Sequence, residues 1–132
     1  MKLSELHECL TYDDILLKPQ FSEILPTQTD LKTKFSKNIN LNIPIASSAM
    51  DTVTEGCTAE WMARLGGIGV IHKNLTPTEQ ALEVTRVKSY IVDDLNRKAA
   101  ALDKNLNLLV AGAMGVSDKE FERAKLLVEA GM

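Results

Sequence analysis

Residues 68–79, Ile-Gly-Val-Ile-His-Lys-Asn-Leu-Thr-Pro-Thr-Glu, carry the pattern that decides the fold. The run 68–71 is continuously apolar, which is typical of a strand buried on both faces. Thr76 and Glu79 have the spacing of a capping box, and Pro77 occupies the first helical position, where its missing N–H costs nothing. The stretch therefore predicts a buried strand, a short loop and a helix, in that order.

The same order of elements occurs on both sides of this stretch. An apolar run at 43–48 precedes a Thr-x-x-Glu box at 52–55, and another at 108–116 precedes a Ser-x-x-Glu box at 117–120. We expect the first helix to stop at Gly66, where a left-handed residue suits a helix end. Three strand–loop–helix units predict an α/β fold with a parallel sheet and right-handed crossovers.

The rest of the chain divides around these units. Residues 1–42 lack sustained helical periodicity and are predicted to form a lead-in segment, with 15–17 and 30–35 as candidates for short strands. Residues 43–132 hold the three units. Within them, 89–107 is polar, has no clean period and is long for a connection between a helix and a strand.

Two parallel-sheet architectures compete for this pattern. A dinucleotide-binding fold needs G-x-G-x-x-G in its first turn, but Gly67 and Gly69 lie before or within a strand, and no third glycine follows at the required spacing. A (β/α)8 TIM barrel takes about 250 residues. A lead-in and three units therefore predict the front part of a barrel, cut off before its fourth strand.

Composition excludes several classes of function. The net charge is −3, so there is no basic excess for binding nucleic acid. No apolar run approaches the roughly 20 residues that span a bilayer, and the first residues have no signal-peptide core. Two cysteines, Cys9 and Cys57, without a secretory signal predict a cytoplasmic protein with reduced thiols. We expect no metal site in this chain, because two cysteines and two histidines are too few for structural zinc.

Residues 47–52, Ser-Ser-Ala-Met-Asp-Thr, are the most unusual stretch. Small hydroxyl residues let a ligand approach the backbone, and a helix that starts after Thr52 would point free N–H groups at an anion such as phosphate. Alternatively, Ser47 and Ser48 only end a strand, while Asp51 and Thr52 cap the helix. The residues by themselves leave both interpretations open.

Several long blocks resemble the inosine-5′-monophosphate (IMP) dehydrogenases. They are 10–19 (LTYDDILLKP), 42–55 (NIPIASSAMDTVTE), 66–74 (GGIGVIHKN), and 109–113 (LVAGA) followed by 128–131 (VEAG). The resemblance implies a (β/α)8 barrel that forms homotetramers and oxidises IMP to XMP with NAD⁺ and water in guanine nucleotide synthesis. In this family a cysteine attacks C2 of the purine, hydride leaves to NAD⁺, and water hydrolyses the adduct. A potassium ion orders the cysteine loop.

The resemblance also assigns roles to individual residues. Ser48 and Met50 match residues that contact the bound nucleotide, through a hydroxyl hydrogen bond and through thioether packing on the purine. Asp51 is either structural or a support of the active site. His72 and Asn74 are expected to border the site, where His72 either transfers a proton or fixes the backbone by hydrogen bonds.

The resemblance places the chemical step outside this chain. Cys9 and Cys57 do not match the catalytic cysteine, which lies with the NAD and potassium contacts in segments that follow. The chain alone is therefore expected to be inactive and to need the remainder of the barrel. The pair of CBS modules that most members insert is replaced by 89–107. Alternatives are a fragment of GMP reductase, a sister enzyme, and a non-catalytic interaction module.

Overall fold

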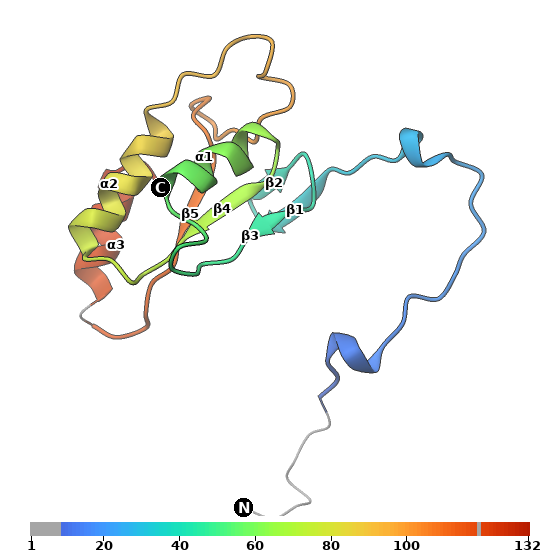
Figure 1. Ribbon diagram of the computed structural model, residues 1–132, viewed down its shortest axis with the longest axis horizontal. Helices are drawn as coiled ribbons and strands as arrows, with labels where there is room; N and C mark the ends of the chain where they lie inside the picture. Colours follow the sequence, from blue (N-terminus) through green and yellow to red (C-terminus); the bar gives the residue numbers. More distant parts are fainter. Residues whose placement is uncertain (1–8, 119) are drawn as a thin grey trace, which may run out of the picture.

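The computed structural model describes residues 9–118 and 120–132. Two short 3-10 turns, Tyr12–Asp14 and Pro26–Gln28, precede an antiparallel hairpin of β1 (Thr33–Ser36) and β2 (Ile39–Leu41). Strands and helices then alternate (Figure 1). They are β3 (Ala46–Ser47), α1 (Gly56–Arg64), β4 (Ile68–Ile71), α2 (Pro77–Lys88), β5 (Val110–Gly112) and α3 (Glu120–Glu129).

The second sheet is parallel, with β4 between β3 and β5. Ala46 pairs with Ile68, and Gly69 pairs with Val110. The predicted parallel α/β arrangement of three strand–helix units is therefore confirmed. Within the described part of the chain, β3 and β5 each have one neighbouring strand, so both outer edges of this sheet are open.

The main core lies where α1, α2 and α3 pack together on the parallel sheet. Its fully buried members include Ala59 of α1, Ile71 of β4 and Val84 of α2. Gly69 has no room for a side chain, because a Cβ there would overlap Ala59. Helix α1 thus packs directly on the backbone of β4, which explains why a glycine stands inside the strand.

The two edge strands are shorter than the sequence predicts. Strand β3 covers only Ala46–Ser47 instead of 43–48, because Pro44 has no N–H and Ile45 donates its N–H to the oxygen of Ile43 (2.9 Å) in a tight turn. Strand β5 covers Val110–Gly112 instead of 108–116. An edge strand has one ladder partner, so pairing stops where that partner ends.

The predicted start of the first helix is wrong. Thr52 and Glu55 form no capping box, because Thr52 adopts a left-handed turn conformation (φ 61°) and α1 begins only at Gly56. The first N–H of the helix, from Gly56, donates instead to the carboxylate of Glu83 on α2 (2.7 Å). The predicted stop is confirmed, since Gly66 has φ 96°.

The second and third helix starts differ from each other. The box of Thr76 and Glu79 forms as predicted, with Pro77 at the first position of α2. The box predicted at 117–120 is wrong, because the Glu120 carboxylate accepts from Gly115 N (3.1 Å) instead. Residue 119 of that box lies outside the described residues.

None of the described helices is long and apolar enough to cross a membrane.

The lead-in segment extends away from the helices and sheets (Figure 1). The strand expected at 15–17 is wrong: Leu16 and Leu17 are each 98% exposed and pair with no strand. The second expected strand is present, shifted from 30–35 to Thr33–Ser36. Residues 15–17 have an apolar sequence but no partner strand, and a strand needs one to satisfy its backbone.

Residues 89–107 contain no helix or strand, yet they are tied to the rest of the fold. The side-chain amide of Asn42 donates to the oxygens of Ala99 (3.0 Å) and Ala100 (2.9 Å). Ala101 N donates to Ala63 O at the end of α1 (2.7 Å). The irregular segment therefore closes over the amino-terminal edge of the parallel sheet.

Candidate functional site

Three loops leave the parallel sheet at the same edge. Because β3, β4 and β5 are parallel, their carboxyl ends lie together, and the loops 48–55, 72–76 and 113–118 begin there (Figure 1). Parallel α/β proteins place their ligands at this edge. All five residues selected from the sequence, Ser48, Met50, Asp51, His72 and Asn74, belong to the first two of these loops.

The first loop is fixed from inside by Thr54. This residue is 0% exposed, and its hydroxyl donates to Ser48 O (2.6 Å) and lies 2.9 Å from the hydroxyl of Ser47. The N–H groups of Val53 and Thr54 both donate to Met50 O (3.1 Å each). The loop is therefore a hydrogen-bonded turn around one buried hydroxyl rather than a loose connection.

The first loop is also joined to the second. The amide of Asn74 donates to the carboxylate of Asp51 (2.6 Å), and His72 N donates to Thr54 O (3.4 Å). The structure thus brings Asp51, His72 and Asn74 together, as expected for residues that border one site. For Asp51 the geometry shows a structural contact, since its carboxylate holds the second loop.

His72 is buried, with 2% exposure, and its two ring nitrogens have different surroundings. Nδ1 accepts the N–H of Asn74 (3.1 Å), so the neutral ring carries its proton on Nε2. Nε2 lies 3.7 Å from Asp51 Oδ1 and 3.6 Å from Glu55 Oε1, too far for hydrogen bonds. The backbone-fixing role proposed for His72 is visible in the bond from Asn74.

The atoms of Asp51, Glu55 and His72 lie within 4.8 Å of one another and could be considered as metal ligands. A histidine that binds a metal through one nitrogen normally donates an N–H from the other. Here the other nitrogen accepts an N–H, so the tautomer does not fit a metal on Nε2. The arrangement is that of an N–H on His72 Nε2 facing the carboxylates of Asp51 and Glu55, and not that of a cation site.

Ser48 and Met50 present their side chains to solvent at this edge. Met50 is 58% exposed, and Ser48 is also exposed. Among the described residues, the Ser48 hydroxyl takes part in no hydrogen bond, while its backbone oxygen accepts from Met50 N and Thr54. Both side chains are therefore free to contact a ligand, although their backbone is held.

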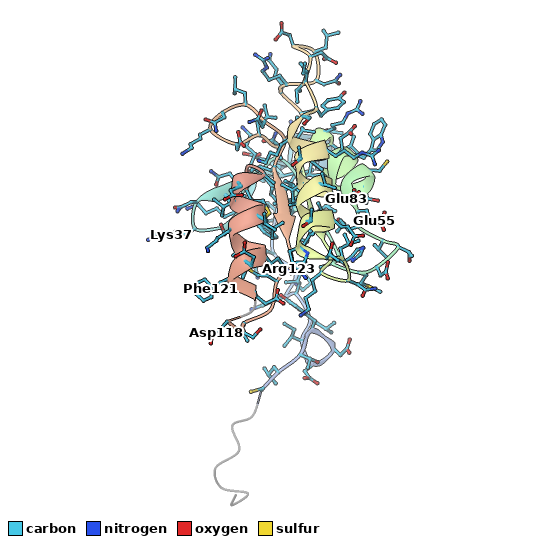
Figure 2. All side chains as sticks on the ribbon, turned by 90° about the vertical axis from the view of Figure 1, so that its left-hand side faces the viewer. Lys37, Glu55, Glu83, Asp118, Phe121 and Arg123 are labelled. Carbon is cyan, nitrogen blue, oxygen red and sulfur yellow. The ribbon has the colours of Figure 1, made fainter. Side chains whose placement is uncertain are left out.

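The first N–H of α1 is not free for an anion, which disfavours the phosphate site that was one of two interpretations of residues 47–52. Its leading N–H group, from Gly56, is already bonded to the Glu83 carboxylate, and the carboxylate of Glu55 lies beside it (Figure 2). A phosphate there would replace one carboxylate and face another. The local sequence does not reveal this bond, because Glu83 lies on the next helix, α2.

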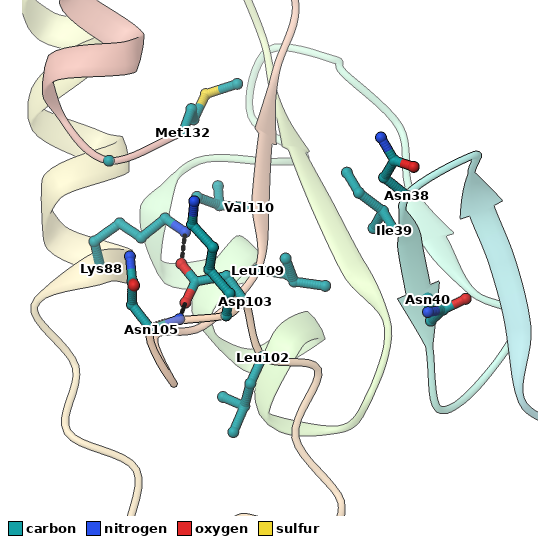
Figure 3. A pocket seen from close by; sticks show the side chains of 12 residues that line it. Asn38, Ile39, Asn40, Lys88, Leu102, Asp103, Asn105, Leu109, Val110 and Met132 are labelled. Atoms are coloured by element: carbon teal, nitrogen blue, oxygen red, sulfur yellow. Dashed lines mark hydrogen bonds and ion pairs between the residues drawn. The ribbon is translucent and has the colours of Figure 1, made fainter.

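A cavity of about 530 Å³ lies at the opposite, amino-terminal edge of the sheet, away from these loops (Figure 3). Two of its charged groups, on Lys88 and Asp103, satisfy each other. Lys88 pairs with Asp103 (2.8 Å), and Asn105 N and Asn107 N donate to the same carboxylate. Burial alone would raise the pKa of Asp103, but these bonds together lower it below its ordinary value of 3.8. The Lys88–Asp103 pair therefore acts as a structural contact of the cavity wall.

Sequence reasoning missed three buried polar residues near the site: Thr54, Gln80 and Arg123. A signal existed for two of them. Gln80 shares a helix face with Val84, four residues on, and Arg123 shares one with Leu127. A polar residue within an apolar stripe is expected to be buried and bonded.

The chain also matches a known protein family and several known proteins. The family model of the IMP dehydrogenase / GMP reductase domain matches residues 9–132. The inosine-5′-monophosphate dehydrogenase of Cryptosporidium parvum is 44% identical over 151 aligned residues, which cover 93% of this chain and 37% of that protein. The enzyme of the same name from Nitrosopumilus maritimus is 58% identical over 64% of this chain and 18% of its own length. That from Rhizobium tropici is 54% identical over 63% and 17%. The chain thus spans well under half the length of these relatives.

Proposed function

Because the chain belongs to the IMP dehydrogenase / GMP reductase family, we propose that it supplies the lead-in and the first three βα units of a (β/α)8 barrel that oxidises IMP to XMP with NAD⁺ and water. The observation that carries this proposal is the loop 48–55. It is fixed by the buried Thr54, it is bonded to the next loop, and it presents Ser48 and Met50 to solvent. Such a preorganised loop at the carboxyl edge suits recognition of a nucleotide.

Ser48 and Met50 have complementary parts in this proposal. The free hydroxyl of Ser48 hydrogen-bonds a polar group of the nucleoside, and the exposed thioether of Met50 packs on the purine face. The phosphate of IMP binds elsewhere, because Asp51 and Glu55 are acidic and Glu83 occupies the start of α1. Loops after the strands that follow must supply the phosphate contacts.

The described residues do not fit NAD⁺. The pyrophosphate of NAD⁺ would meet the same carboxylates of Asp51 and Glu55, and the first N–H of α1 is taken. We therefore propose that the NAD⁺ contacts lie in the remainder of the barrel, together with the potassium ion and the catalytic cysteine that the family resemblance implies. Cys9 and Cys57 are exposed thiols, and neither lies in the loops at the carboxyl edge.

The open edges of the sheet support the proposal that the remaining strands of the barrel pair with this part of the protein. Strands β3 and β5 each lack a second neighbour among the described residues, and an unpaired edge is open to further strands. We propose from these edges that the isolated front part is inactive, and from the family resemblance that the complete protein is a cytoplasmic homotetramer. In it, residues 89–107 stand where other members insert CBS modules.

Substitution of Ser48 tests the proposal in the complete barrel. Ser48→Ala removes one ligand hydrogen bond, so KM for IMP is expected to rise about two- to tenfold. Ser89→Ala is the matched control, because Ser89 lies at the end of α2 and its hydroxyl bonds only Thr85 O. NADH formation from IMP is the readout. An unchanged KM in Ser48→Ala would remove Ser48 from the site.

The same preparation separates the two reactions of the family. The complete barrel is assayed with IMP and NAD⁺, and in parallel with GMP and NADPH. We expect turnover of IMP, because the relatives that match this chain carry the name of the dehydrogenase. Turnover of GMP alone would replace the dehydrogenase by the reductase.

A further inference from the structure

Gln80 of α2 is a fully buried polar side chain that reaches across two strands. It is 0% exposed, and its amide nitrogen donates to Ile71 O (3.1 Å) and Ala113 O (2.9 Å). Ile71 ends β4, and Ala113 follows the end of β5. One side chain therefore bridges the two strand ends from which the second and third loops start, and it adds to the backbone bond from Ala113 N to Ile71 O (2.8 Å).

Arg123 of α3 continues this connection and lies toward α2 (Figure 2). The residue is 8% exposed, and its guanidinium donates to Gln80 Oε1 (2.8 Å) and twice to Leu75 O (3.1 Å each). Leu75 closes the loop that begins with His72 and Asn74. The planar fork of arginine thus fixes that loop against both helices.

Glu120 completes the chain of hydrogen bonds. Its carboxylate accepts from Arg123 Nε (2.9 Å) and from Gly115 N in the third loop (3.1 Å). The N–H of Gly115 and then the charges of Arg123 and Lys73 hold the pKa of Glu120 below its ordinary value of 4.5. Helices α2 and α3 are therefore joined to two loops through three polar side chains.

We infer that Gln80 and Arg123 are positioning residues for the nucleotide site. They fix the loops 72–75 and 113–118 relative to each other. Through the bond between Asn74 and Asp51, they also fix the loop that carries Ser48 and Met50. Neither touches the exposed face of Ser48 or Met50, so each acts through the backbone. This inference rests on the proposed function only for the identity of the ligand.

The bonding pattern favours positioning over simple stability. Buried charged groups can often be replaced by apolar residues without loss of stability, so their presence needs another explanation. Here the donors of Gln80 and Arg123 go mainly to backbone oxygens of loops at the carboxyl edge. Apolar residues would fill the same volume but would remove these donors from Leu75 O and Ala113 O. Ile71 O would keep the N–H of Ala113 (2.8 Å).

The test uses the complete barrel with Gln80→Met and Arg123→Met, which keep the side-chain length. Val87→Ala is the matched control, because Val87 is fully buried on α2 but takes no part in these bonds. Arg123→Lys keeps the charge and one donor toward Leu75 O, so it is expected to fall between wild type and Arg123→Met. It also keeps the inference testable if the methionine variants do not fold.

Two readouts are measured on the same variants. Without nucleotide, amide exchange at Gly115 is expected to rise about tenfold in Gln80→Met, although Gln80 does not touch Gly115. With IMP and NAD⁺, KM for IMP is expected to rise about fivefold or more, while kcat changes less than about twofold. Val87→Ala is expected to lower the free energy of unfolding and to leave both readouts at wild-type values.

The outcomes separate this inference from the proposed function. Gly115 exchange that is unchanged in Gln80→Met, or a KM that rises equally in Val87→Ala, overturns the positioning role. If the wild-type barrel does not oxidise IMP, the proposed function fails. Exchange at Gly115 then still decides whether the loops are coupled through Gln80 and Arg123.

Discussion

Thr54→Val isolates the hydroxyl that holds the first loop of the site. Valine keeps the shape of the fully buried side chain but removes the bond to Ser48 O (2.6 Å) and the contact with the Ser47 hydroxyl (2.9 Å). With a net value of about 0.5–1.5 kcal/mol for each hydrogen bond, the free energy of unfolding should fall by about 1–3 kcal/mol.

The effect on function follows from the loop. Without the hydroxyl, Ser48 and Met50 lose the turn that presents them, so KM for IMP should rise about fivefold in the complete barrel. Thr54→Ser is the control: it keeps the hydroxyl and loses one buried methyl, at about 1 kcal/mol. Its stability loss should therefore be comparable, while its KM should stay within about twofold of wild type.

Urea unfolding and initial rates of NADH formation measure the two quantities. We expect the free energy of unfolding to fall in both variants and KM for IMP to change in Thr54→Val alone. Equal KM values in the two variants would show that the buried hydroxyl contributes to folding but does not organise the site. A wild-type stability in Thr54→Val would refute the hydrogen-bond account itself.

Three further predictions concern the scaffold. Gly69→Ala should cost about 3 kcal/mol in urea unfolding, because its Cβ would overlap Ala59; a loss below about 1 kcal/mol would contradict this packing. Thr76→Ala should lower the melting temperature more near neutral pH than well below pH 4.5. The bond from Glu79 N to the Thr76 hydroxyl is lost at both pH values, whereas the bond from that hydroxyl, which lowers the pKa of Glu79, contributes only while the carboxylate is ionised. An equal effect at both pH values would contradict the bond between the Thr76 hydroxyl and the Glu79 carboxylate. Cys57→Ser should still form the covalent IMP adduct in the complete barrel, because this exposed thiol does not match the catalytic cysteine in the family resemblance. Loss of the adduct would move the nucleophile into this chain.

The sequence predicted the elements that local chemistry controls. Strand β4 covers Ile68–Ile71 as the unbroken apolar run indicates, and α2 begins at the capping box of Thr76 and Glu79. Gly66 ends α1 in the left-handed conformation. Each of these features depends on residues within a few positions of one another, so a linear pattern is sufficient to reveal it.

The predictions failed where a residue outside the local pattern bonds a group at the start of the helix. Thr52 and Glu55 have the spacing of a capping box, but Glu83 of the next helix takes the Gly56 N–H. Glu120 was expected to close a box at the start of α3, but its carboxylate turns to Gly115. The residues 15–17 have a strand-like sequence but find no partner strand.

The candidate site shows the same division. The sequence by itself determined the order of strands and helices and the edge at which the loops gather. It also revealed the family resemblance through which Ser48 and Met50 were selected. Only the tertiary structure decided that Thr54 fixes their loop, that His72 is buried, and that Gln80 and Arg123 join the loops. The physical reason is that apolar period and helix caps are local, whereas the partner of a buried polar group is chosen among residues far apart in the chain.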